Sequence, residues 1–367
     1  MRREAYYVAN LLVVLAAWTL LPAFAAPIQR TKVGVIVGTT GLAAASGLSV
    51  KRGIELADRS FDSANNIDFI FEDDGFQVKN AVSAADKLIA HDHVDALITF
   101  SGSTSLAVSI VAERRGVPMV AVTALSKVSA GRDLIRTIFV PPGDLARMIG
   151  AEVMLRQPVR VALITSTQDA LLGLRTAIRG SLMEHAAHTS AESHSFVVFD
   201  EEIVPGDVEL SSVATRMLRR NPDVIISLTL PPQSATLAKL LRNQRYTGKV
   251  IVGPPTYNYQ EIAAAQGALA GSLLVGPLSG PSNSFFRLYQ ETFHEPSVAE
   301  GMYGYDAATF IIEAAASGDM KRFLAEAESV KGIAGVYTKD AENLFAVPAE
   351  MKVITSDGRV VRYREKD

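Results

Sequence analysis

Residues 94–123 read VDALITFSGSTSLAVSIVAERRGVPMVAVT and contain two short β-branched apolar runs, Ala96–Phe100 and Met119–Val122. Between them, Leu106–Arg115 has the apolar spacing of a helix. This pattern is typical of buried parallel strands joined by a crossover helix. The sequence therefore predicts a strand, a hydroxyl-rich loop at Ser101–Thr104, a helix and a second strand.

The same strand–helix pattern repeats along the chain in two series. A Pro/Gly/Asp break at Pro141–Asp144 separates the two series. The other strands predicted in these series are Val33–Val37, Ile67–Phe71, Arg160–Thr165, Phe196–Phe199, Val224–Leu228 and Val250–Val252. Further along, a strand is predicted at Ser272–Val275 and extended runs at Gly335–Thr338 and Glu350–Thr355. Two series predict two sheets, and hence two lobes with a cleft between them. No long Ser/Gly/Pro linker joins the halves, so short crossovers are expected.

The bulk composition is that of a globular protein with room for two domains: 367 residues, 48% hydrophobic and 20% charged. A net charge of −3 gives no support for nucleic-acid or anionic-membrane binding. Cysteine is absent, which excludes disulfides, thiolate metal sites and cysteine nucleophiles.

The first residues have the order of a secretory signal: Arg2 and Arg3, an apolar run Val8–Leu21, and the small-residue triplet Ala23–Ala25. Cleavage is expected after Ala25, and an uncleaved anchor is the alternative. Export without a cysteine for lipid attachment predicts a soluble protein of a bacterial periplasm.

The sequence contains none of the common catalytic or nucleotide-binding motifs. Neither phosphate-binding glycine pattern is present, and Ser103 lacks the G-x-S-x-G frame of a hydrolase. The histidines of His91-Asp92-His93, and His185, His188 and His194, are expected in solvated connections. The run Glu72–Asp74 is interpreted as a solvated acidic turn. We expect no cofactor, no metal and no enzymatic activity.

Several local signatures occur in a characteristic order. They are Lys32–Gly47, Phe71–Asp74, Val94–Ser103, Gly116–Pro118, Arg160–Gln168, Asn221–Val224 and Tyr303–Ala307. On these residues the chain resembles the type I periplasmic binding proteins of the branched-chain amino-acid family, the receptors of ABC importers.

The resemblance implies an α/β fold with two Rossmann-like lobes, each with a parallel central sheet, joined by a multi-crossover hinge. Its expected parts are a signal peptide at 1–25, an N-terminal lobe at 26–143 and a C-terminal lobe at 144–277. Helices at 278–334 would return to the N-terminal lobe, and an extended segment at 335–367 would cross back. Loops at the carboxyl ends of strands would hold a ligand, and hinge closure would bury it.

The resemblance also implies site residues. Ser101, Gly102, Ser103 and Thr104 match the loop that holds the ligand carboxylate in amino-acid-binding members, although their hydroxyls could instead only cap the next helix. Thr123, Ala124 and Leu125 match a second contact, with Leu125 where a hydroxyl is expected.

In the second lobe, Ala170 stands where members of the family often have an aromatic residue, and Pro255 where they have an acidic one. A buried ammonium without a counter-charge would cost several kcal/mol, so an α-amino acid is not favoured as ligand. Tyr257 and Tyr305 are the remaining candidates, because a ring with a hydroxyl suits an aromatic or apolar ligand with one or two polar groups. Tyr257 could instead pack on the lobe surface.

The function expected from these residues is capture of a small molecule by hinge closure, for an ABC importer whose membrane subunits recognise the closed form. A carboxylated aromatic or aliphatic molecule, or an amide, is the expected ligand. A sensor that feeds a receptor or regulatory partner is the alternative, and branched-chain amino-acid binding is less favoured. A monomer is expected.

Overall fold

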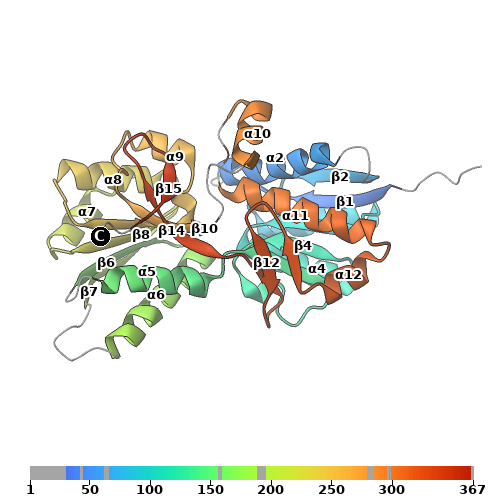
Figure 1. Cartoon of the computed structure of the whole chain (residues 1–367), viewed down its shortest axis with the longest axis horizontal. Coiled ribbons are helices and arrows are strands. Elements are labelled where there is room, and N and C mark those ends of the chain that lie inside the picture. The colour runs from blue at the N-terminus through green and yellow to red at the C-terminus, as the bar shows by residue number, and fades with distance from the viewer. Residues whose placement is uncertain are drawn as a thin grey trace, which may run out of the picture. The chain divides into compact units, whose positions relative to one another are not determined.

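The structure is a computed structural model that describes residues 30–41, 44–61, 66–155, 159–187, 196–278, 284–295, 297 and 299–364. The signal-peptide prediction for residues 1–25 lies outside this part of the chain, as do His188 and His194. Residues Thr31–Asp367 form one unit by their contacts. Within this unit the chain forms two sheets, each covered by helices (Figure 1).

The first sheet has the strand order β11-β12-β13-β5-β4-β3-β1-β2. Its strands are β1 (Thr31–Ile36), β2 (Ile67–Glu72), β3 (Ala96–Phe100), β4 (Met119–Val122), β5 (Ile135–Phe139), β11 (Ser329–Lys331), β12 (Val336–Lys339) and β13 (Leu344–Ala346). Strands β1 to β5 and β13 run parallel, and β11 and β12 form an antiparallel edge.

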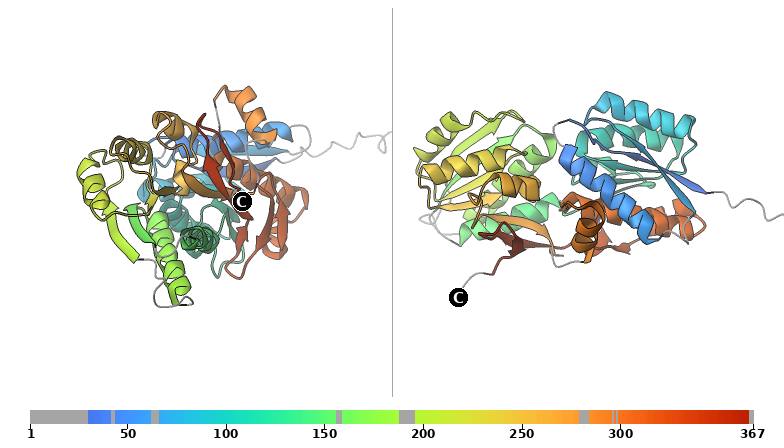
Figure 2. Two further views of the ribbon diagram at one scale, coloured as in Figure 1. Left: turned by 60° about the vertical axis from the view of Figure 1, so that its left-hand side comes forward. Right: turned by 90° about the horizontal axis from the view of Figure 1, so that it is seen from above.

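The helices of this first lobe are α2 (Ala44–Ser60), α3 (Val78–Ala90), α4 (Gly102–Arg115), η1 (Ser126–Val128), α10 (Ser284–Phe293), α11 (Ala299–Ala316) and α12 (Met320–Glu326). Helix α2 packs against α11, whereas α3 packs against α4 (Figure 2). The apolar residues of the first pair share one buried cluster, and those of the second pair share another. The sheet is thus covered on both faces, which explains its continuous apolar strands.

The second sheet has the order β15-β14-β10-β9-β8-β6-β7. Its strands are β6 (Arg160–Ser166), β7 (Phe196–Ile203), β8 (Val224–Leu228), β9 (Lys249–Val252), β10 (Leu273–Pro277), β14 (Ala349–Ile354) and β15 (Val360–Arg362). Its helices are α5 (Pro142–Met154), α6 (Asp169–Ala187), α7 (Ser211–Leu218), α8 (Gln233–Asn243), η2 (Pro254–Thr256) and α9 (Tyr259–Ala264). Strands β14 and β15 add an antiparallel edge to the parallel β6–β10.

The parallel parts of both sheets have the same order, β2-β1-β3-β4-β5 and β7-β6-β8-β9-β10. In each sheet the strand order reverses direction between two neighbouring strands, β1 and β3 in the first sheet and β6 and β8 in the second. The connections on either side of this point therefore lead away from each other. Ligands of open α/β sheets bind at such switch points, beyond the carboxyl ends of the strands. The predicted two-lobed fold is therefore confirmed, with antiparallel edge strands added to the expected parallel sheets.

The chain passes between the sheets three times, after β5, after β10 and after β13. Backbone hydrogen bonds join these crossings: Val347 N donates to Phe139 O over 3.2 Å, and Leu278 N donates to Pro348 O over 2.9 Å. The crossings therefore lie side by side.

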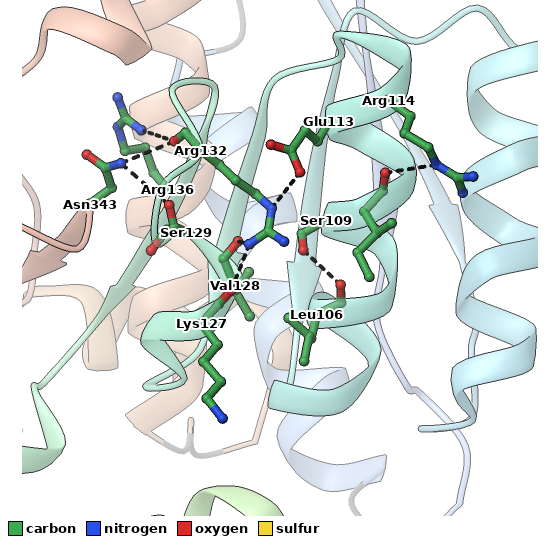
Figure 3. A network of polar contacts seen from close by, with 11 residues as sticks. Leu106, Ser109, Glu113, Arg114, Lys127, Val128, Ser129, Arg132, Arg136 and Asn343 are labelled. Carbon is green, nitrogen blue, oxygen red and sulfur yellow. Dashed lines mark hydrogen bonds and ion pairs between the residues drawn. The ribbon is translucent and has the colours of Figure 1, made fainter.

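Strand β5 was missed in the sequence because Arg136 interrupts its apolar run. The side chain is nevertheless buried, and its guanidinium donates to the carbonyls of Arg132 (3.1 Å), Ile135 (2.9 Å) and Ala325 (3.1 Å). Figure 3 shows this arginine beside Ser129 and Asn343. Helix α5 was missed as well, because Pro142 was interpreted as part of a break, although proline is tolerated in the first turn of a helix.

Side chains of the same region also hold strand β13 against β5 (Figure 3). Ser129 Oγ donates to the carbonyl of Glu342 over 2.9 Å, and Asn343 Nδ2 donates to the carbonyls of Ser129 (3.4 Å) and Arg132 (3.2 Å). The segment after residue 335 thus supplies β12 and β13 to the first sheet before β14 and β15 join the second.

Candidate ligand-binding site

A large cavity opens at the carboxyl ends of the strands of both sheets. It encloses about 1640 Å³ of space free of atoms, open solvent at its mouth included. Its lining comes from the loops after the parallel strands of the two sheets and from the adjoining helix ends. Both switch points contribute, through Gly41 and Ser101 in the first lobe and through Gln168 and Leu230 in the second.

The loop after β3 forms the polar part of the first-lobe wall. Ser101, Gly102 and Ser103 line the cavity, and Ser101 has a positive φ of 82°, which a residue with a side chain rarely adopts. Helix α4 begins here at Gly102, four residues earlier than predicted, without a side-chain cap. Its first backbone N–H groups are therefore available beside the cavity, and a helix N-terminus favours an anion.

Thr104 lies behind this wall, not in it. It is fully buried, and its hydroxyl donates to the carbonyl of Phe100 over 3.0 Å and lies 2.9 Å from Ser101 Oγ. The hydroxyls of Ser101 and Thr104 thus contact each other and the end of β3, and neither caps α4.

After β4, Thr123 and Ala124 line the cavity and Leu125 does not. Thr123 Oγ1 accepts a hydrogen bond from Leu125 N over 3.2 Å. A Cβ added at Gly102 would lie 3.5 Å from Leu125, so this leucine supports the start of α4 from behind the wall.

In the second lobe, Ala170 lines the cavity together with Leu171 and Leu174 of α6. Gln168 precedes this helix, and its Oε1 accepts from Leu171 N over 3.2 Å. Pro255 also lines the cavity, as do Pro205, Pro231 and Pro254. This wall is therefore largely apolar.

Neither predicted tyrosine lines the large cavity. Tyr257 is buried, and its hydroxyl has no hydrogen-bond partner among the described residues. It lines a separate space of about 310 Å³, shared with Glu300 and Tyr303. The ring of Tyr305 packs on Phe285, with 5.7 Å between centroids.

Aromatic residues that the sequence analysis did not select form part of the wall. Phe76 and Phe100 line the cavity and meet edge to face, with 5.9 Å between ring centroids. A side chain at Gly38 would overlap the ring of Phe76, so this glycine leaves room for the ring. The position of Phe76 just beyond β2 was the available signal.

The sequence predicted that Glu72–Asp74 form a solvated acidic turn, but in the structure one of these carboxyls is buried. Asp74 is completely buried; its Oδ1 accepts from Phe76 N over 2.8 Å, and Oδ2 has no partner among the described residues. Burial raises the pKa of Asp74. Asp73 is exposed and accepts from Thr39 N and Gly75 N, both over 2.9 Å. These carboxyls hold the loop that presents Phe76.

Glu300 is the one ionisable side chain among the described residues that line the cavity. It lies in the first turn of α11 and is 9% exposed. Burial raises its pKa from 4.5 to about 7. Glu300 was not predicted as a site residue, because it belongs to a late helix and not to a loop that follows a strand.

Other site types find no support in the described part of the chain. Among these residues there is no group of three or more His, Cys, Asp or Glu side chains that could hold a metal ion. His91 and His93 are exposed, as predicted. No described helix is both long and apolar enough to cross a membrane.

Three comparisons relate the chain to known proteins. A family model described as "Periplasmic binding protein" matches residues 30–363. The Leu/Ile/Val-binding protein BraC3 of Rhizobium johnstonii is 26% identical over 249 residues, which are 66% of this chain and 66% of that protein. The aligned part is thus just under two thirds of that relative.

Solved structures share the fold. The leucine-binding protein LivK of Thermotoga maritima has a TM-score of 0.79 at 21% identity, over 91% of this chain and 98% of that chain. An ABC-transporter solute-binding protein of Rhodopseudomonas palustris BisB5, in complex with 3,4-dihydroxybenzoic acid, has a TM-score of 0.80 at 18% identity, over 92% and 98%. The family match spans both lobes and the cavity between their strand ends. The chain therefore belongs to the periplasmic binding protein family.

Proposed function

We propose that this protein is the periplasmic solute-binding component of an ABC importer, and that its two lobes close around a small molecule in the large cavity. The ligand is a carboxylated aromatic or aliphatic molecule, or an amide, in preference to a standard α-amino acid. Capture involves no covalent step, and the membrane subunits of the importer recognise the closed monomer.

The start of α4 carries this proposal. Ser101 and Ser103, two hydroxyl-bearing residues, line the cavity, and the N-terminal N–H groups of α4 adjoin them without a side-chain cap. Together these donors suit a carboxylate or an amide oxygen. Among the described lining residues there is no lysine or arginine, so the helix terminus is the main anion-binding feature.

The rest of the lining suits an apolar body. Phe76, Phe100, Leu171 and Leu174 line the cavity from both lobes. Apolar pockets with a few polar groups at defined positions are typical of small-molecule sites. When the lobes close, the second-lobe side chains would cover the ligand that the first lobe holds.

A thermal-shift screen tests the ligand class. The purified mature chain is melted with benzoate, hexanoate, benzamide, leucine and valine. A ligand present at about 100 times its Kd stabilises the native state by ~2.7 kcal/mol, which raises the melting temperature by several degrees. Benzoate or hexanoate should produce this shift. A strong shift with leucine or valine, and none with the acids or the amide, contradicts the proposed ligand class.

The site assignment is tested with Ser101→Ala and Ser103→Ala, which should each weaken the binding of the stabilising acid about tenfold. Ser83→Ala is the matched control, because Ser83 lies on the exposed side of α3 and its hydroxyl donates only to Lys79 O. If both variants retain wild-type affinity, the carboxylate is bound elsewhere.

A further inference from the structure

Glu300 occupies a defined place on the cavity wall. Its helix, α11, packs against α2 and against β3, β4 and β5 of the first sheet. Tyr303, one turn further along, rests on Phe139 at the end of β5, with 4.7 Å between ring centroids. Glu300 and Phe139 both line the cavity. The carboxyl therefore lies near the end of β5.

The hydroxyl loop Ser101–Ser103 follows β3, and β4 lies between β3 and β5. Neighbouring strands are about 4.8 Å apart, so the ends of β3 and β5 are separated by roughly 10 Å. Thr123 and Ala124, which follow β4, line the cavity between them. The first-lobe wall thus has donors at one end and a carboxyl at the other.

We propose that Glu300 is a specificity-determining residue, which accepts a hydrogen bond from a hydroxyl or amide N–H group at the end of the ligand remote from its carboxylate. This inference rests on the proposed function and narrows the ligand to a molecule with two polar ends and an apolar centre. An α-amino acid carries both polar groups on one carbon and is too short to bridge the two ends of the wall.

Two amide side chains that also line the cavity already accept hydrogen bonds at the start of their own helices. Asn258 Oδ1 already accepts from Gln260 N (2.9 Å) and Glu261 N (3.3 Å) at the start of α9. Gln168 Oε1 is similarly engaged with Leu171 N. Within the described residues, no other side chain hydrogen-bonds or ion-pairs with the Glu300 carboxyl. Apart from its own backbone N–H, a donor on the ligand would therefore be the main hydrogen-bond partner of this buried carboxyl.

The protonation of Glu300 gives a second signature. Burial raises its pKa to about 7, so both forms are populated near neutral pH. Its titratable neighbours are Tyr257 and Tyr303, which line the small space behind it, and burial raises the pKa of both, so they stay neutral. A ligand donor stabilises the ionised carboxylate and lowers its pKa, so binding should release a proton near pH 7.

The test compares 4-hydroxybenzoate and 4-carbamoylbenzoate, which carry a remote donor, with benzoate and 4-methylbenzoate, which do not. Calorimetric titration at pH 7 in buffers of different ionisation enthalpy gives both affinity and proton release. The wild-type chain should prefer the donor-bearing acids at least tenfold and release protons only with them. Glu300→Leu should abolish that preference, so that the four acids bind this variant with affinities within about threefold of one another.

Glu300→Gln keeps an uncharged acceptor and should retain part of the preference without proton release, which guards against a folding defect in the leucine variant. Glu313→Gln, on the same helix but outside the cavity lining, should behave as wild type. If the acids bind without preference for a donor, or if binding takes up protons, the role of Glu300 is refuted while the ligand class stands. If none of the four acids binds, the proposed ligand class fails as well.

Discussion

The two walls of the cavity differ in chemistry. The first-lobe wall carries Ser101, Ser103, Thr123 and, on α11, Glu300. The second-lobe wall carries leucines, five prolines and two amides, Gln168 and Asn258, whose carbonyl oxygens already accept hydrogen bonds from their own helices. From this contrast we propose that the first lobe selects the ligand by its polar groups, whereas the second lobe supplies shape and excludes water.

The largest expected effect is on the free energy of unfolding, and it concerns the packing of α2 against α11, the helix that carries Glu300 on the first-lobe wall. A methyl group at Gly53 of α2 would overlap the carbonyl oxygen of Gly301 on α11, one residue after Glu300. Because this neighbour is backbone, the helices must separate, and Gly53→Ala should lower the free energy of unfolding by about 3 kcal/mol or more. Urea denaturation measures this change.

Gly180→Ala in α6 of the second lobe is the matched control, since nothing lies within 4 Å of the added carbon. It should leave stability unchanged or raise it by up to ~1 kcal/mol, because alanine favours helix. Equal losses for both variants would mean that close helix packing does not distinguish the two walls.

The pH dependence of stability tests the burial of Glu300. Its pKa is about 7 in the folded protein against an ordinary 4.5, so its neutral form is favoured by folding. This contribution is complete below about pH 4.5 and is lost as pH rises through 7, for a total of about 3 kcal/mol at most. Glu300→Gln should therefore stabilise the ligand-free protein relative to wild type more at pH 8 than at pH 5.

Asp306 complicates this measurement, because burial raises its pKa from 3.8 to about 6. Its carboxyl accepts from Ile333 N, Ala334 N and the Tyr337 hydroxyl, so it remains in both proteins and its effect cancels in the difference. A difference in stability between wild type and Glu300→Gln that does not change from pH 5 to pH 8 would contradict the burial of Glu300.

A carboxylate introduced at the first wall should repel an acidic ligand. Ser103→Asp places a negative charge in the first turn of α4, where it favours the helix but opposes a bound carboxylate. Benzoate affinity should fall about a hundredfold, with the melting temperature of the free protein unchanged or higher. Ser83→Asp on α3 provides the charge-matched control; a similar loss there would indicate a long-range effect of net charge.

The smallest effect is expected at the second wall. Pro255→Ala removes a small apolar area from the cavity lining, so the affinity for benzoate should fall only two- to threefold, or roughly 0.5 kcal/mol. Titration calorimetry can resolve this difference. A loss larger than that of Ser101→Ala would assign ligand selection to the second lobe and reverse the comparison.

Local pattern predicted most of the fold. Strands β3 and β4 have the bounds that the sequence predicted, and helices α10, α11 and α12 lie within the range 278–334 expected for helices. Strand β5 was missed because a buried arginine resembles a surface residue until the carbonyls of Arg132, Ile135 and Ala325 are known to surround it. A partner 189 residues away along the chain has no local sequence signal.

The candidate site also contains residues that local pattern predicted correctly and one that it did not. Ser101, Ser103 and Ala170 line the cavity because residues directly after parallel strands must lie at one edge of a sheet. Tyr257 also follows a strand, but its ring is buried beside Gly276 and Lys352, where a larger residue than glycine would crowd it. Strand position alone does not fix the direction of a side chain.

By itself, the sequence determined the two series of strands, the crossover helices and the hydroxyl loop, because hydrophobic periodicity and turn residues act over a few positions. Only the tertiary structure decided that Glu300 reaches the cavity, that Asp74 is buried and that β13 pairs with β5. These outcomes depend on packing between segments far apart in the chain, where burial and the available partners set the position and charge of each group.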